Sequence, residues 1–198
     1  DDQEVKLKRQ SRIYFQISGA GHEALQTGIG RTLVPGRDWA VGYYRDRALM
    51  LALGYDAEAN MKAALGTPDE PSGGGRQMPV HFGCKELKIL NKSSCTGTQF
   101  LHAVGAAEAG RYIEWLKGQG VTEDLEDSHP EEVIVCCTGD GATSEGEWWE
   151  ETRSDPVKLK KVVLAYHTRC PDMKSKMKGF MITQYREELR QSESVIKD

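Results

Sequence analysis

A short apolar run that ends in a glycine-rich turn constrains the fold of this 198-residue chain more than any other feature. Residues 132–138 read Glu-Val-Ile-Val-Cys-Cys-Thr, an apolar, β-branched segment without alternation, which is typical of a parallel strand buried on both faces. The run continues into Gly-Asp-Gly-Ala-Thr-Ser-Glu-Gly at 139–146 and then into a helical pattern. Since ligands bind at the carboxyl ends of such strands, we expect this turn to bind a ligand.

The rest of the pattern favours an α/β fold. Residues 162–166 are predicted to form a second parallel strand, and residues 39–44 a short one. Apolar spacing and end signals predict helices over residues 3–17, 23–33, 45–53, 56–65 and 100–118. This order predicts a mostly parallel sheet with helices on both faces, in one domain over residues 1–198. Residues 66–76 are too rich in Gly and Pro for a core element and are predicted to be a linker or a mobile active-site loop.

The residue types of the turn at 139–146 suit a diphosphate and a divalent cation. Asp140 offers the hard oxygen ligand that Mg²⁺ prefers, and this ion takes further ligands from phosphate oxygens. Gly139 and Gly141 let the backbone turn sharply, so that the following amides can meet a diphosphate. The alternative is an ordinary turn with an aspartate helix cap. The buried strand before the turn and the segment after it favour the ligand site.

Composition excludes several classes of function. Lys plus Arg number 26 and Asp plus Glu number 30, and the net charge of −4 argues against a nucleic-acid partner. No apolar run approaches the ~18 residues of a membrane helix, so we expect no membrane partner. The acidic first residues show no signal peptide. The five cysteines form no CxxC pair, which predicts reduced, mostly buried thiols and an intracellular protein.

Several segments together resemble one enzyme family. The turn at 139–146 is similar to the first half of the thiamine diphosphate motif, Gly-Asp-Gly followed later by Asn-Asn. The chain also resembles, in the same order along the sequence, the alpha subunit of branched-chain 2-oxo acid dehydrogenases (2-oxoisovalerate dehydrogenase). The segments that carry this resemblance are Gly-His-Glu-Ala at 21–24, Tyr-Arg at 44–45, Gly-Arg-Gln-Met-Pro-Val-His-Phe-Gly-Cys-Lys at 75–85, Ser-Ser-Cys-Thr-Gly-Thr-Gln at 93–99 and His-Ala-Val-Gly-Ala-Ala at 102–107. The match covers about residues 3–150 and implies the thiamine diphosphate-binding fold.

The resemblance implies a cofactor site. Tyr44 and Arg45 match the pair that holds the cofactor, and a guanidinium can donate twice to a diphosphate. Asp140 matches the Mg²⁺ ligand of the family. Considered alone, Arg45 would be a surface ion-pair residue on a helix. The other residues that the resemblance assigns to cofactor binding are Ser94, Thr96, Gly141 and Ala142.

The resemblance also implies a potassium site and a histidine near the substrate. Ser93, Thr98 and Gln99 match a K⁺ site that steadies the cofactor loop, and all three supply oxygen atoms. The alternative for Thr98 is a helix cap. His81 matches a histidine on the substrate side, which implies a catalytic role in carboxylate binding or proton handling. A histidine between two apolar residues is, in isolation, more often a packed residue.

The resemblance ends after about Glu151. The strand at 162–166 leads into His-Thr-Arg-Cys at 167–170 in place of Asn-Asn, so the second Mg²⁺ ligand is missing. Residues 152–198 therefore match poorly. One explanation is that the polypeptide has a stretch after Glu151 that this chain omits. The other is a diverged or truncated relative that cannot hold Mg²⁺ and the cofactor alone. We favour the first, because residues 1–150 keep the site residues.

The function that the resemblance implies is oxidative decarboxylation of a branched-chain 2-oxo acid, with acyl transfer to a lipoyl carrier. The implied partners are a beta subunit or fused beta half, a lipoyl-bearing acyltransferase and a small 2-oxo acid. The implied location is a bacterial cytoplasm or the mitochondrial matrix after transit-peptide removal. The alternatives are a pyruvate or acetoin dehydrogenase alpha subunit and a non-catalytic scaffold homologue. A Gly-rich nucleotide binder ranks last, because its loop motifs are absent from the sequence.

Overall fold

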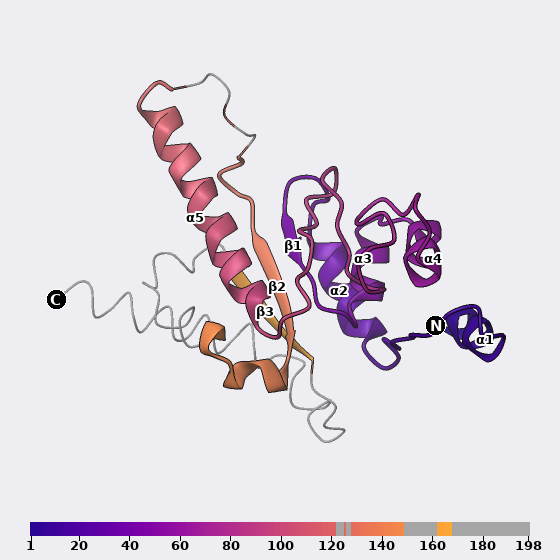
Figure 1. Cartoon of the computed structure of the whole chain (residues 1–198). Coiled ribbons are helices and arrows are strands. Elements are labelled where there is room, and N and C mark those ends of the chain that lie inside the picture. The colour runs from indigo at the N-terminus through magenta and orange to yellow at the C-terminus, as the bar shows by residue number, and fades with distance from the viewer. Residues whose placement is uncertain (122–124, 126–127, 149–161, 168–198) are drawn as a thin grey trace.

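The computed structural model describes residues 1–121, 125 and 128–148, together with the backbone of residues 162–167 (Figure 1). The expectations for residues 152–161 and 168–198 lie outside these ranges. The elements in chain order are α1 (Asp2–Arg9), α2 (Glu23–Thr32), β1 (Trp39–Val41), α3 (Arg47–Ala52), α4 (Ala57–Leu65), α5 (Thr98–Gly118), β2 (Ile134–Gly139), the 3-10 helix η1 (Asp140–Ser144) and β3 (Val162–His167). None of the helices in the described ranges has the length and apolar character that a membrane span needs.

The strands form a parallel sheet in the order β1-β2-β3. The expected strands at 132–138 and 162–166 are confirmed, and the backbone of Gly139 lies opposite that of His167. β1 ends at Val41, earlier than the predicted residue 44. The reason lies in Tyr43, whose backbone N–H donates to Asp46 Oδ2 at 2.8 Å. A side chain therefore takes the place of the next strand contact, and the backbone turns.

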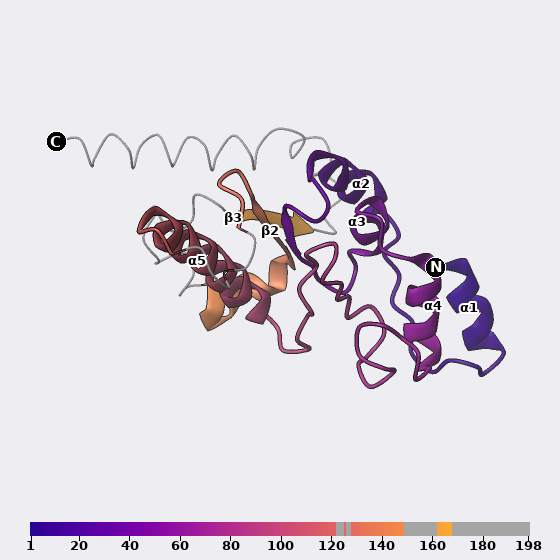
Figure 2. The same cartoon turned by 90° about the horizontal axis from the view of Figure 1, so that it is seen from above.

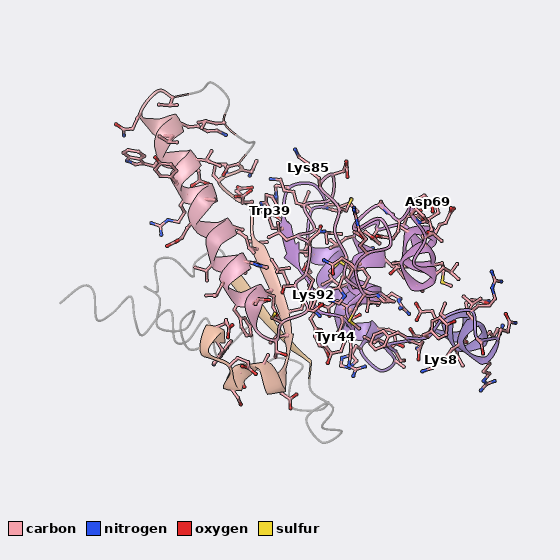
Figure 3. All side chains as sticks on the ribbon, in the orientation of Figure 1. Lys8, Trp39, Tyr44, Asp69, Lys85 and Lys92 are labelled. Carbon is pink, nitrogen blue, oxygen red and sulfur yellow. The ribbon has the colours of Figure 1, made fainter. Side chains whose placement is uncertain are left out.

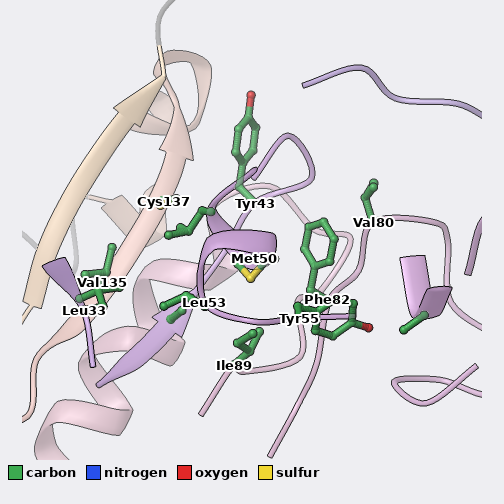
Figure 4. Packing of buried hydrophobic residues seen from close by; sticks show 13 residues of the cluster. Leu33, Tyr43, Met50, Leu53, Tyr55, Val80, Phe82, Ile89, Val135 and Cys137 are labelled. Atoms are coloured by element: carbon green, nitrogen blue, oxygen red, sulfur yellow. The ribbon is translucent and has the colours of Figure 1, made fainter. Parts of the chain in front are cut away.

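Helices cover both faces of this sheet, as the sequence pattern predicts. Successive side chains of β2 alternate between the two faces. Val135 and Cys137 join a hydrophobic cluster on the side of α2 and α3, whereas Ile134 and Cys136 join a second cluster on the side of α5. The two views show α5 on one side of the strands and α2 and α3 on the other (Figures 1 and 2). Figure 4 shows the first cluster, with the ring of Tyr43 directed away from Met50 and Leu53.

Close approach of α2 and α3 depends on one glycine. A Cβ atom at Gly30 would lie 2.6 Å from Ala52 Cβ, a distance that side chains do not adopt. Leu49 of α3 is fully buried beside this contact and is among the largest buried side chains. The pair of helices therefore forms a tightly packed layer against the sheet, and this layer supports the turn that follows β1.

The first helix is shorter than expected. α1 ends at Arg9, whereas the apolar spacing predicted a helix to residue 17. Ser11 takes a left-handed φ of 54°, and the N–H of Arg12 donates to the carbonyl of Leu7 at 2.9 Å. This left-handed residue ends the helix, although no glycine marks the position. Ile13 is buried after this turn, which accounts for its place in the apolar pattern.

The Gly- and Pro-rich segment at 66–76 is a loop that hydrogen bonds anchor at several points. Its centre is Glu70, a buried carboxylate that accepts hydrogen bonds from the backbone N–H groups of Ser72 and Gly73 at 2.8 and 2.7 Å. Burial alone would raise the pKa of Glu70, but the hydrogen bonds from Ser72 and the backbone outweigh burial and lower it. The Ser72 carbonyl also accepts from Asn91 Nδ2 at 3.1 Å, which ties the loop to a distant segment.

Candidate functional site

The carboxyl ends of β1 and β2 bring two of the predicted site segments to one edge of the sheet. The two strands are parallel, so the turn after Val41 and the turn after Gly139 leave the sheet on the same side. A Cβ atom at Gly139 would lie 3.7 Å from the ring of Tyr43. The Tyr44–Arg45 pair therefore lies next to the segment that contains Asp140.

The backbone of the Tyr44–Arg45 turn is fixed from α2. Gln26 is fully buried, and its Nε2 donates to the Arg45 carbonyl at 2.9 Å and to Asp46 Oδ1 at 3.2 Å. Its Oε1 accepts from the backbone N–H of Ala48 at 3.1 Å, at the start of α3. Three hydrogen bonds from one side chain thus hold the turn in place, and Asp46 is the residue that precedes α3.

The Arg45 side chain is half-buried and oriented. Its Nη1 donates to the Ser18 carbonyl at 2.8 Å, and its guanidinium carbon lies 5.1 Å from the centre of the Tyr44 ring. A guanidinium has five N–H donors, so further donors are available to a bound anion. The arrangement suits a group that binds a phosphate oxygen without further ordering of the side chain.

A lysine that the sequence analysis did not single out lies against the same two tyrosines. Lys92 is only 7% exposed, and its Nζ lies 4.3 Å from the centre of the Tyr44 ring and 5.6 Å from that of the Tyr43 ring. Figure 3 shows Lys92 and Tyr44 close together beside the sheet. Burial lowers the pKa of the ammonium to about 8, while the charge of Asp46 acts in the opposite direction.

The glycine-rich turn forms η1 directly after β2. Asp140 and Gly141 are exposed, whereas Ala142 is buried in the cluster beside α5. The hydroxyl of Thr143 donates to the Asp140 carbonyl at 2.7 Å and fixes the turn. In the described part of the chain, no group of three or more His, Cys, Asp or Glu side chains could hold a metal ion. Asp140 is the carboxylate of this turn that a divalent cation could use, with its other ligands from a phosphate or water.

The loop at 93–97 and the start of α5 contain the predicted potassium ligands, and Cys95 contacts two of them, Ser93 and Thr98. The backbone N–H of Cys95 donates to Ser93 Oγ at 3.2 Å, and the Thr98 hydroxyl donates to the Cys95 carbonyl at 3.0 Å. The alternative of Thr98 as a helix cap is wrong, because α5 begins at Thr98 and Gly97 precedes it as the cap residue, with φ of 88°. A Cβ atom at Gly97 would lie 3.2 Å from Glu145 Cβ, so this loop contacts the segment that follows η1.

Gln99 is the predicted potassium ligand with the clearest need for a partner. It is 4% exposed, and its Nε2 donates to Thr138 Oγ1 at 3.2 Å and to the Cys137 carbonyl at 3.4 Å. Its Oε1 is buried without a hydrogen-bond partner among the described residues. A buried acceptor without a partner costs about 1–3 kcal/mol, and a cation at this oxygen would offset that cost. This unpartnered oxygen is thus a group that a cation such as K⁺ could bind.

The structure also brings His81 and Ser94 together. His81 is 7% exposed, its Nε2 lies 2.8 Å from Ser94 Oγ, and its Nδ1 lies 3.2 Å from the Pro79 carbonyl. A carbonyl only accepts, so Nδ1 donates to the Pro79 carbonyl, and Nε2 accepts from the Ser94 hydroxyl whenever this nitrogen carries no proton. Ser94 and Thr96 are both exposed in the loop. Two residues with different predicted roles thus form one hydrogen-bonded pair.

A sequence model of the family described as "Dehydrogenase E1 component" matches residues 1–158, which include every segment described above apart from β3. This chain belongs to the dehydrogenase E1 family. Members of this family depend on thiamine diphosphate.

The relatives of this E1 family chain include 2-oxoisovalerate dehydrogenase alpha subunits from a bacterium and from animals. It is 42% identical over 111 residues to the 2-oxoisovalerate dehydrogenase subunit alpha of Bacillus subtilis (strain 168), covering 56% of this chain and 34% of that protein. It is 33% identical over 140 residues to the mitochondrial 2-oxoisovalerate dehydrogenase subunit alpha of Mus musculus, which covers 71% of this chain and 28% of the mouse protein. It is 35% identical over 140 residues to the subunit of the same name in Caenorhabditis elegans, and this match covers 71% of this chain and 29% of the nematode protein. The matches thus span about a third or less of these relatives.

Residues that support the site were missed at the level of the sequence. Gln26 and Asp46 lie 20 positions apart and meet only through the packing of α2 on α3. The available signal was Asp46 itself, because an acid is common at the start of a helix and α3 begins at the next residue. Lys92 gave a weaker signal, because a charged residue is expected on the surface. Its place directly before the Ser-Ser pair of this E1 family chain was the only indication.

Proposed function

We propose that this chain is the alpha part of a decarboxylating 2-oxo acid dehydrogenase of the branched-chain type, with the thiamine diphosphate-binding fold. The observation that carries the proposal is the meeting of three segments at one edge of a parallel sheet: the Tyr44–Arg45 turn, the turn at 139–144, and the loop at 93–97 with the start of α5. The shared name of the relatives supports the choice of a branched-chain 2-oxo acid as the substrate class.

In this proposal the diphosphate end of the cofactor is held by the residues after β1 and β2. Arg45 donates to phosphate oxygens while its other contacts to Ser18 and Tyr44 keep the guanidinium in place. The exposed backbone of Gly141 and the following residues of η1 offers N–H donors, and Asp140 offers one carboxylate to Mg²⁺. When bound, thiamine diphosphate supplies the carbanion chemistry by which a 2-oxo acid loses CO₂.

The loop at 93–97, together with the first residues of α5, serves as a second support of the same site. Three oxygen atoms offer ligands to K⁺: Gln99 Oε1, Ser93 Oγ and the hydroxyl oxygen of Thr98. A K⁺ ion bound by them would connect the loop to the end of β2. Ser94 and Thr96, which are both exposed in this loop, would contact the cofactor. His81 orients the Ser94 hydroxyl through Nε2, and once that hydrogen bond opens, the same nitrogen can accept a proton on the substrate side.

The partners in this proposal follow from the class of enzyme. A beta subunit or fused beta half completes the active site, and a lipoyl-bearing acyltransferase receives the acyl group. The names of the relatives, one bacterial and the others mitochondrial, support a location in a bacterial cytoplasm or the mitochondrial matrix.

The test is cofactor binding to an Arg45→Ala variant. Thiamine diphosphate with Mg²⁺ is titrated into the full chain together with its beta partner, and binding is followed by tryptophan fluorescence. We expect Arg45→Ala to weaken binding about 10-fold or more, because a charge-assisted hydrogen bond contributes roughly 1.5–3 kcal/mol. Arg31→Ala is the matched control, since Arg31 is exposed in the last turn of α2. Equal affinity in Arg45→Ala and the wild type would overturn the assignment.

A further inference from the structure

Lys92 is a buried cation without an anionic partner among the described residues. Lysine is seldom buried unless it is paired, because removal of an ammonium from water is costly. The ion pairs of the described residues do not include Lys92, although they include Lys88, whose Nζ lies 3.3 Å from Glu132 Oε2. The ring faces of Tyr43 and Tyr44 stabilise the Lys92 ammonium only in part, by cation–π contact.

The carboxylate whose charge acts on Lys92 has other partners. Asp46 Oδ2 accepts from the Tyr43 N–H, and Oδ1 accepts from Gln26 Nε2. Asp46 is thereby occupied in holding the turn that precedes α3. The three N–H donors of Lys92 are available to an acceptor that comes from outside the described residues.

The position of Lys92 joins the two cofactor segments of the proposed function. Its ammonium lies over the rings of Tyr44 and Tyr43. The Tyr44 ring also contacts the Arg45 guanidinium, and the Tyr43 ring lies beside Gly139. We propose that the Lys92 ammonium is an anion-binding group of this site, which meets an anionic oxygen of the bound ligands. That oxygen belongs either to the phosphate end of the cofactor or to the carboxylate of the 2-oxo acid. This inference rests on the proposed function and adds a residue to it.

The test compares Lys92→Met, which removes the charge and keeps the length, with Lys92→Arg, which keeps the charge. Lys88→Met is the matched control, because Lys88 also lies over an aromatic ring, that of Trp39 at 5.1 Å, but has its own carboxylate partner. Full chain and beta partner are assembled for each variant. The measurements are the affinities for thiamine diphosphate with Mg²⁺ and for inorganic pyrophosphate, and the KM for 2-oxoisovalerate.

We expect Lys92→Met to lose about 10-fold or more in one of these measurements, since one charge-assisted hydrogen bond is removed. Lys92→Arg and Lys88→Met should stay within about 3-fold of the wild type, on the same scale. A loss of affinity for the cofactor and for pyrophosphate assigns Lys92 to the phosphate. A raised KM with unchanged cofactor affinity assigns it to the substrate carboxylate. Unchanged affinities together with an unchanged KM in Lys92→Met would overturn the inference.

The resistance of the variants to urea separates a binding role from a structural one. Removal of an unpaired buried charge should leave the folded state as stable as before or more stable. If Lys92→Met loses binding but not stability, the inference is supported. If Lys92→Met binds its ligands normally but is less stable than the wild type, and Lys92→Arg is equally unstable, the inference is contradicted. Failure of the wild type to bind thiamine diphosphate would instead refute the proposed function itself.

If Lys92→Met does not fold, the wild type still decides the question. Acylation of lysines is followed by peptide mass spectrometry with and without pyrophosphate or 2-oxoisovalerate. Protection of Lys92 but not of Lys88 supports the inference. Equal labelling of Lys92 in the presence and absence of both ligands overturns it.

Discussion

Replacement of Gln26 by leucine should destabilise the chain and loosen the cofactor turn at the same time. Gln26 is fully buried and makes three hydrogen bonds, at 2.9, 3.2 and 3.1 Å, to the Arg45 carbonyl, to Asp46 and to the Ala48 N–H. Leucine has a similar size, so the change removes the hydrogen bonds without a large cavity. At about 1 kcal/mol for each bond, the free energy of unfolding should fall by roughly 3 kcal/mol.

Urea unfolding followed by tryptophan fluorescence measures this loss. With a slope of about 2 kcal/mol per molar urea, the midpoint should fall by about 1.5 M. Gln3→Leu is the control, because Gln3 is exposed in α1 and such changes stay within about 0.5 kcal/mol. A loss of less than about 1 kcal/mol in Gln26→Leu would refute the view that this side chain fixes the turn. Thiamine diphosphate affinity should fall with stability, since the Arg45 carbonyl loses its donor.

Two further predictions concern the core and the 66–76 loop. Leu49→Ala, at a fully buried position of α3, should lower the free energy of unfolding by about 2–5 kcal/mol in the same assay, and a loss near zero would show that the site is not packed as described. Glu70 has a lowered pKa in the folded state, so its contribution to stability is present above its ordinary value of 4.5 and is lost as pH falls through the lower folded value. Glu70→Gln should therefore have a lower free energy of unfolding than the wild type at pH 7, and the gap between the two proteins should shrink in acid. A gap of equal size at pH 3 and pH 7 would contradict this.

The strands and most helices could be predicted from the sequence because their signals are local. The run at 132–138 and the apolar spacing of α5 each reflect burial of one segment, and burial is what periodicity records. The end of α1 was not predictable in the same way. Ser11 adopts a left-handed conformation without the glycine that normally announces it.

The site was predictable in its segments but not in its supports. Residue types and a family resemblance located Arg45 and Asp140, because their motifs are continuous in the sequence. The supports depend on contacts between distant segments, so no local pattern contains them. Polar residues are expected at the surface, and burial of Glu70 and Lys92 is decided by backbone donors in one case and by tyrosine rings in the other.

The strand β1 is synthesised well before β2, the strand with which it pairs. The N–H of Val133 donates to Asp38 Oδ1 across 95 residues of sequence, at the point where the two strands begin to pair. At the usual 5–20 residues per second, the first strand leaves the ribosome on the order of 5–20 seconds before its neighbour. During that interval Trp39–Val41 has an open strand edge, and Tyr44 and Arg45 lack the glycine-rich turn beside them. Slower translation in the region before residue 133 would lengthen this exposure, so aggregation of the nascent chain should depend on codon choice there.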